Sequence, residues 1–176
     1  MDASGAAFDA ALVEEAARKS ALVWVRGPEG PARALWHVWH DGAVWLVGGP
    51  GEQPLDGLGL ADGVRAEVTC RSKDKGGRLV AWPAAVAEPA PGGREWTAAV
   101  AELAAKRLNG RDTAAQTAAR WRADCRVLRL APDGGPVVRP AHMPTASPAA
   151  PPLPSPATTR SGTPSGLPAR RRRRAR

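Results

Sequence analysis

Two histidines and three tryptophans surround one predicted turn, and they are the side chains of this sequence best suited to chemistry. The segment from Leu35 to Val47 reads Leu-Trp-His-Val-Trp-His-Asp-Gly-Ala-Val-Trp-Leu-Val. Imidazole exchanges protons near neutral pH, and indole offers a flat apolar face with one N–H donor. The Asp41-Gly42 pair favours a tight two-residue turn, and its aromatic and β-branched neighbours favour strands. We therefore expect a stiff aromatic hairpin against which a flat ring can lie.

The spacing within this hairpin limits what its residues can do together. Side chains alternate between the two faces of a strand, so His37 and His40 point to opposite sides and cannot chelate one ion. We therefore expect no metal site, although a single histidine beside a cofactor can donate a proton or ligate haem. The same alternation separates Trp36 from Trp39, so one of them lines the core while the other meets a helix, a second subunit or a ligand.

A second group of polar residues flanks a predicted glycine turn. Arg71, Ser72, Lys73, Lys75 and Arg78 lie on either side of Gly76-Gly77. Arginine and lysine bind phosphate through charge-assisted hydrogen bonds, so this turn is a candidate anion site. The alternative is an ordinary solvated hairpin turn.

Other catalytic arrangements find little support. Ser72 has no partner histidine or carboxylate that the sequence can assign, as a nucleophile would need. Cys70 and Cys125 are too few for a disulfide framework or a thiolate metal site, and we expect both to be small buried residues. If the protein is an enzyme, a bound redox cofactor is the best explanation.

The net charge of +8 is distributed unevenly along the 176 residues. Residues 1–131 hold 17 basic and 16 acidic side chains, whereas residues 132–176 hold 8 basic and 1 acidic. Eleven of the 18 prolines also lie in residues 132–176, which have almost no large apolar side chains. Such a segment cannot bury enough apolar surface to fold, so we predict one domain at 1–131 and a disordered basic tail at 132–176.

The arginine run in residues 170–176 has two interpretations. One is an electrostatic contact with nucleic acid, and the other, which we favour, is a solvated extension without a dedicated partner. No aromatic residue is interleaved with the arginines to stack on a base. The sequence also has no apolar run of membrane-spanning length and no secretory leader, so we expect a cytoplasmic protein without a membrane partner.

Hydrophobic periodicity within the predicted domain indicates six strands and two helices. The helices are expected at about 4–20 and 95–108, and a glycine-rich loop at 48–63. The strands are expected at 21–26, 33–40, 43–48, 64–71, 78–88 and 120–131. Short antiparallel strands in this number favour a small, nearly closed barrel with helical covers, because closure removes exposed edges.

The order of these elements, the Trp-His hairpin and the Arg71-Ser72-Lys73-Asp74 segment resemble the split-barrel flavin-binding proteins related to pyridoxamine phosphate oxidase, and most closely an actinobacterial branch of them. The resemblance covers roughly residues 8–131. It implies an α+β fold built on a six-stranded antiparallel split β-barrel. It also implies a homodimer with FMN, or the related deazaflavin coenzyme, in a cleft between the subunits.

The resemblance also suggests which residues contact the cofactor. It places the strand residues Trp36, His37, Val38 and Trp39 along the ring system. It places Gly48 and Gly49 where the third strand approaches the phosphate, and Arg71, Ser72, Lys73 and Arg78 are the candidate phosphate ligands of the folded part. Many members of this family carry a serine or threonine and a lysine just after the third strand, whereas this chain has Gly48-Gly49-Pro50-Gly51-Glu52-Gln53.

Three functions of different classes are consistent with these observations. The first is a flavin- or deazaflavin-dependent oxidoreductase that acts on a small molecule. The second is a non-catalytic member that uses the same barrel for dimerisation or ligand storage. Association with nucleic acid through the arginine tail is a third.

Overall fold

The computed structural model describes residues 3–72, 77–108, 110 and 112–142. Lys73, Lys75 and the arginine run at 170–176 lie outside the described residues. The helices are α1 (Ala3–Lys19), α2 (Arg94–Lys106) and α3 (Ala114–Asp124), followed by a short 3-10 helix, η1 (Pro140–His142). The strands are β1 (Leu22–Arg26), β2 (Arg33–Trp36), β3 (Val38–His40), β4 (Ala43–Gly48), β5 (Arg65–Arg71), β6 (Arg78–Ala87) and β7 (Arg126–Pro132).

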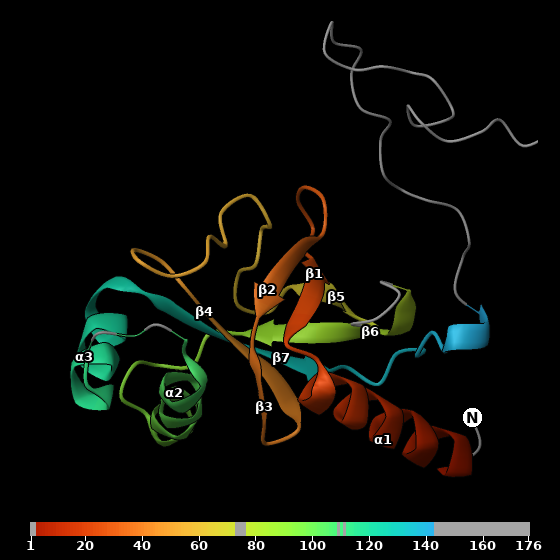
Figure 1. Ribbon diagram of the computed structural model, residues 1–176. Helices are drawn as coiled ribbons and strands as arrows, with labels where there is room; N and C mark the ends of the chain where they lie inside the picture. Colours follow the sequence, from red (N-terminus) through yellow and green to blue (C-terminus); the bar gives the residue numbers. More distant parts are fainter. Residues whose placement is uncertain (1–2, 73–76, 109, 111, 143–176) are drawn as a thin grey trace, which may run out of the picture. The chain divides into compact units, whose positions relative to one another are not determined.

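All seven strands belong to one antiparallel sheet in the order β2-β1-β5-β6-β7-β4-β3. The first and last strands of this order, β2 and β3, are consecutive in the chain and are interrupted only at His37. The sheet therefore curls until its two edges meet in a single interrupted strand, which leaves a nearly closed barrel. Figure 1 shows α1 on one side of this barrel and α2 with α3 on the other. The predicted split-barrel class is confirmed, and the predicted strand at 33–40 is the one that divides into β2 and β3.

The barrel has one core inside it and another outside. Val44 and Leu46 of β4 point into the barrel, where they join residues of β1, β5 and β6. Trp45 and Val47, on the opposite face of β4, pack against α2 and α3. β4 is buried along its whole length because it is covered on both faces. The alternation predicted for the hairpin holds as well, since Trp39 packs against the inner core and Trp36 against the outer one.

The last predicted strand, 120–131, is wrong in its first half. Residues 114–124 form α3, and only the residues from Arg126 onward form a strand. Thr113 caps the helix: its side chain accepts a hydrogen bond from the Gln116 backbone, and Gln116 bonds back to the backbone of Thr113. This capping box satisfies free N–H groups at the helix start, and it places Trp121 on a helix instead of a strand. The number of helices is therefore three in the described chain, compared with the two predicted.

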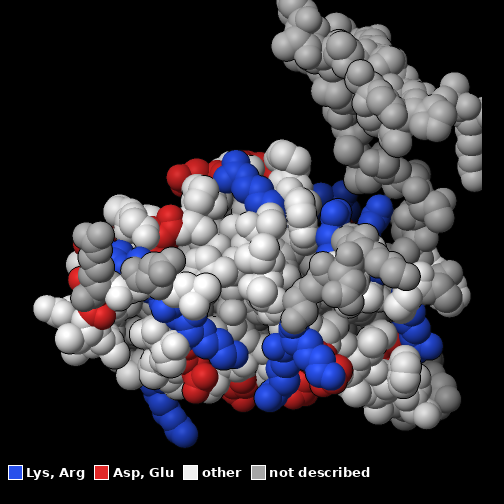
Figure 2. Space-filling view, viewed as in Figure 1, with Lys and Arg blue, Asp and Glu red and all other residues white. Residues whose placement is uncertain are grey.

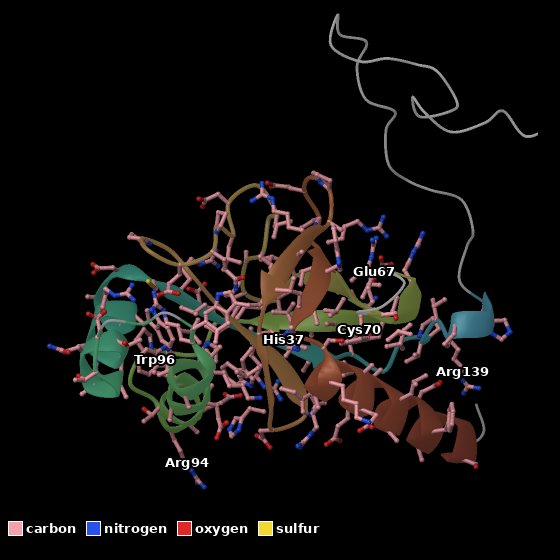
Figure 3. All side chains as sticks on the ribbon, in the orientation of Figure 1. His37, Glu67, Cys70, Arg94, Trp96 and Arg139 are labelled. Atoms are coloured by element: carbon pink, nitrogen blue, oxygen red, sulfur yellow. The ribbon has the colours of Figure 1, made fainter. Side chains whose placement is uncertain are left out.

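Residues 132–142 contact the barrel, whereas the sequence analysis assigned them to the tail. Val138 and Ala81 exchange two backbone hydrogen bonds, of 2.8 and 3.1 Å. Arg139 lies 2.7 Å from Asp9 of α1 and stacks over the Phe8 ring, and Figure 3 shows it beside α1. These contacts tie the segment after β7 to both the sheet and α1.

The described surface agrees with the nearly balanced charge of residues 1–131. Figure 2 shows basic side chains with acidic ones beside them on the face in view. None of the helices in the described part of the chain is long and apolar enough to cross a membrane. Within the same part, no group of three or more histidine, cysteine or acidic residues is arranged to hold a metal ion.

Candidate functional site

A cleft of about 790 Å³ opens where the barrel strand is interrupted. Its walls are the C-terminal ends of α1 and α2, the strand interruption, and the loop at 51–53 that follows β4. Three of the predicted cofactor residues, Trp36, His37 and Trp39, line it. The volume lies within the range usual for small-molecule and cofactor sites.

The strand interruption is held open by a side chain from the loop. β2 pairs with β1 as far as Trp36, and β3 pairs with β4 from Val38 onward. The Gln53 amide takes the place of the missing strand: the Trp36 N–H donates to Gln53 Oε1 at 2.8 Å, and Gln53 Nε2 donates to the Trp36 carbonyl at 2.9 Å. Because buried backbone groups need partners, Gln53 makes the change of sheet partner possible at this point.

His37 lies at the interruption, between α1 and α2 (Figure 3). Only 7% of its surface is exposed, and its Nε2 is 2.9 Å from the carbonyl oxygen of Ala17 at the end of α1. A carbonyl can only accept, so Nε2 carries the proton and Nδ1 is an acceptor. Nδ1 is buried without a hydrogen-bond partner in the described chain. Burial lowers the pKa of His37, against the opposing effect of its bond to Ala17, and the charge of Lys106 lowers it further.

A buried carboxylate forms another wall of the cleft. The Glu52 side chain is 3% exposed, and it receives hydrogen bonds from Arg107 Nε, from Arg120 Nη2 at 2.7 Å and from the Trp121 indole at 2.9 Å. Burial raises the pKa of Glu52, but the hydrogen bonds from Arg120, Trp121 and Arg107 outweigh it, so the net pKa lies below its ordinary value of 4.5. Glu52 thereby ties the glycine-rich loop to α2 and α3.

The rim of the cleft is basic. Arg18 and Lys19 extend from the end of α1, and Lys106 and Arg107 from the end of α2. Arg18 and Lys19 form ion pairs with glutamates one turn earlier on α1, and Arg107 pairs with Glu52. Both helices present their C-terminal, partially negative ends here, and these cations complement the helix dipoles.

The structure places the other predicted ring and loop residues next to the cleft but not on its wall. Val38 is buried in the outer core, facing away from the inner side of the barrel. Gly48 packs against Leu55, and Gly49 lies against Cys125 with a φ of +141°. A side chain at Gly49 would approach the backbone of Asp124 within 2.9 Å, so glycine is needed there for close packing. These two glycines lead into the lining loop at 51–53 without lining the cleft themselves.

The described residues of the predicted anion site, Arg71, Ser72 and Arg78, lie at the end of β5 and the start of β6, and none of these three lines the cleft. The Arg71 guanidinium stacks over Trp24 of β1, with its Cζ 4.2 Å from the ring centroid. The Ser72 N–H donates to the Gly77 carbonyl at 2.8 Å. Arg78 begins β6, beside Arg71 in the sheet register. Lys73 belongs to the residues that the structure does not describe, so the anion site at this turn stays a prediction.

The cysteines have no activating surroundings. Cys70 is fully buried in the inner core, and burial raises the pKa of its thiol to about 11. Cys125 is half-buried, and burial raises its pKa as well. Neither thiol is prepared to act as a nucleophile near neutral pH.

Sequence reasoning missed four residues that shape this site, namely Glu52, Gln53, Lys106 and Arg107. Glu52 and Gln53 were visible only as two polar residues in a glycine-rich loop. Lys106 and Arg107 read as ordinary basic residues at the end of a helix. The residues that they contact or face are distant in the sequence, so no local pattern indicates their role.

Comparison with known proteins supports the fold. No family model and no curated protein matches the sequence. The haem storage protein HutZ from Vibrio cholerae superposes with a TM-score of 0.53 at 9% identity, over 72% of this chain and 91% of its own. A general stress FMN/FAD-binding protein from Xanthomonas citri gives 0.45 at 15% identity, over 82% and 99% of the two chains. The flavocytochrome Anf3 from Azotobacter vinelandii gives 0.44 at 12% identity, over 92% and 86%.

The chain is therefore an α+β protein of the split-barrel class, with one strand shared between the two edges of its sheet. The predicted resemblance to split-barrel flavin-binding proteins is confirmed at the level of the fold.

Proposed function

We propose that this protein binds a planar, negatively charged cofactor, FMN or a deazaflavin coenzyme, in the cleft at the strand interruption and acts as an oxidoreductase on a small molecule. The observation that carries the proposal is the composition of the cleft. It combines two indole side chains, Trp36 and Trp39, with a basic rim, in a volume of about 790 Å³. Aromatic walls suit a flat ring system, and lysine and arginine suit a phosphate or carboxylate group.

Each wall residue has a definite part in such binding. Trp36 is fixed by Gln53 and by its contact with Trp121, whose ring centroid is 6.5 Å away. Lys106 lines the cleft, and its charge would balance a negative group of the ligand. A bound flavin or deazaflavin would supply hydride-transfer chemistry, and the protein would orient the ring and exclude water. His37, neutral and with its Nδ1 lacking a partner among the described residues, is the candidate proton acceptor beside the ring.

We also propose that the chain forms a homodimer. Leu22 and Trp24 share the outer face of β1, and Leu79 lies on the outer face of β6, with β5 between these strands. Leu22 is 48% exposed and Leu79 is 38% exposed. Exposed apolar side chains that gather on one sheet face support burial against a second copy. Light scattering on the purified protein should give twice the chain mass, and a Leu22→Glu variant should shift it toward the monomer.

A second candidate function is storage or carriage of a ligand without catalysis. It is favoured by the buried His37, because a neutral imidazole with a free nitrogen also ligates haem iron. HutZ, which shares the fold, is named a haem storage protein. On this alternative the cleft would bind haemin more tightly than either flavin.

Spectroscopic titration separates these possibilities. Purified protein is titrated with FMN, a deazaflavin coenzyme and haemin, and binding is followed by absorbance and by quenching of tryptophan fluorescence. We expect FMN or the deazaflavin to bind, and Lys106→Ala to weaken that binding by about ten-fold through loss of one charge contact. Arg94→Ala is the matched control, because Arg94 begins α2 and is absent from the cleft lining. Tighter binding of haemin than of either flavin would support storage. If none of the three compounds binds, both candidate functions are contradicted.

A further inference from the structure

Four hydrogen bonds from three side chains converge on the Glu52 carboxylate. Arg107 Nε lies 2.9 Å from one oxygen and 3.2 Å from the other. Arg120 Nη2 and the Trp121 indole nitrogen lie 2.7 and 2.9 Å from the first oxygen. Two guanidinium groups and an indole N–H around one oxyanion are the donor set by which proteins bind phosphate or carboxylate ligands. Here the anion belongs to the chain itself.

The charges at this point do not balance. Arg107 follows the last residue of α2 and Arg120 lies within α3, and each guanidinium also donates to a loop carbonyl, Arg107 to Gly51 at 3.4 Å and Arg120 to Pro50 at 3.0 Å. Glu52 supplies one negative charge to the two positive charges. Asp112 is 3.6 Å from Arg120 and is half-exposed, so it neutralises Arg120 only weakly. Without Glu52, the arginines and the indole N–H would remain as an anion-binding arrangement.

Two glycines shortly before Glu52 adopt backbone conformations that other residues adopt only with strain. Gly49 has a φ of +141° and Gly51 a φ of +76°. Glu52 and Arg107 line the cleft at the end where the loop meets α2, whereas Arg120 and Trp121 are absent from the lining and contact the Glu52 carboxylate instead. A ligand in the cleft can therefore meet all three donors together only where the Glu52 carboxylate now lies.

We propose that Arg107, Arg120 and the Trp121 indole form an oxyanion-binding site that the chain fills with its own Glu52, and that an anionic group of a cleft ligand enters it only by displacing Glu52. The proposal deepens the proposed function, because Glu52 then selects against ligands with a phosphate or carboxylate at this end of the cleft. The negative group of an accepted ligand is directed to Lys106 and the end of α1 instead.

Inorganic phosphate is the probe that tests this site. Its binding to the full-length chain is measured by calorimetry at constant ionic strength, with chloride as the balancing anion. Glu52→Ala should bind phosphate at least about ten-fold more tightly than the unaltered protein, and the double variant Glu52→Ala, Arg120→Ala should lose the gain. Phosphate should also raise the melting temperature of Glu52→Ala more than that of the unaltered protein.

A control and a second variant keep the test decisive. Glu88 forms a bidentate ion pair with Arg126 but lies outside the cleft lining, so Glu88→Ala frees an arginine elsewhere and should leave phosphate affinity nearly unchanged. If Glu52→Ala does not fold, Glu52→Gln keeps the side-chain shape, loses the charge and should still gain affinity. Equal affinity in the unaltered protein and the Glu52 variants, or a gain that survives Arg120→Ala, would overturn the proposal. Because the probe is phosphate alone, these outcomes do not depend on whether a flavin binds.

Discussion

At the scale of single residues, two buried titratable side chains define the cleft, and their surroundings affect them differently. Glu52 is surrounded by cationic and N–H donors, which favour its charged form. His37 is buried beside a backbone carbonyl and near Lys106, and its net environment favours the neutral form. Both pKa values are lowered, so the protonated form of each residue is less stable in the fold than in the unfolded chain.

For Glu52 we predict a contribution to stability that acid removes. A folded-state pKa below the ordinary value of 4.5 means that this stability is present above pH 4.5 and is lost as the pH falls through the folded value. Glu52→Gln should lower the free energy of unfolding by about 1 to 3 kcal/mol at pH 7, because it leaves two half-buried arginines without their counter-ion. Urea denaturation at several pH values measures this, and the difference in the free energy of unfolding between the two proteins should narrow as the pH falls below 4.5.

For His37 the same reasoning applies at higher pH. Its pKa is lowered from 6.5 in the fold, so the unfolded chain binds a proton at a higher pH than the folded chain does. The contribution of His37 to the free energy of unfolding is therefore fully present above pH 6.5 and decreases as the pH falls below it. His37→Gln, which keeps a hydrogen-bonding group but does not titrate, should flatten the stability profile between about pH 7 and pH 5. The matched control variant is His142→Gln, because His142 is exposed and lies outside the cleft lining. An identical slope in the protein and His37→Gln would show that His37 is not held neutral by burial.

At the scale of elements, the strand from 33 to 40 changes sheet partner at His37, and the loop after β4 makes this possible. The Gln53 amide forms two hydrogen bonds with the backbone of Trp36, which would otherwise have no partner on this side of the strand. Trp36 then faces α3, and His37 faces the end of α1. The loop is thus a structural part of the barrel as well as a wall of the cleft.

Removing the Gln53 amide should loosen this junction. Gln53→Ala leaves the N–H and C=O of Trp36 without partners, and we expect it to cost about 2 to 3 kcal/mol of stability. Gln116→Ala is a matched control, because Gln116 is exposed and supports only the cap of α3, so its loss should cost less than about 1 kcal/mol. Chemical denaturation measures both costs. Equal costs for the two variants would contradict a special role for Gln53.

At the scale of the whole molecule, the segment after β7 joins parts of the chain that are far apart in sequence. Asp133 pairs with Arg65 at 2.6 Å, Val138 with Ala81, and Arg139 with Asp9. The segment also contributes Val137 to the inner core. The domain that the structure describes therefore includes residues 132–142.

Shortening the chain tests this boundary. A chain that ends at Ala131 should be less stable than one that ends at His142 by about 2 kcal/mol or more, because it loses the pairing of Val138 and the burial of Val137. The two midpoints of urea denaturation give the comparison. Equal denaturation midpoints for the two chains would place the end of the domain at Ala131 and show that the contacts after β7 do not stabilise the fold.

The sequence by itself determined the local elements and the class of fold. The hairpin, most strands and two helices were predictable because their signals involve residues that are close in sequence. These signals are the period-two alternation, the Asp41-Gly42 turn and the apolar stripe of α2. The helix α3 was missed because the apolar residues Trp121, Val127, Leu128 and Leu130 suggested one strand, although Thr113 and Gln116 carry a capping signal. Only the tertiary structure decided the site. Glu52 meets Arg107, Arg120 and Trp121 across 55 to 69 residues of chain, and Gln53 meets Trp36 across 17. Such contacts depend on barrel closure and helix packing, which no local pattern of side chains encodes.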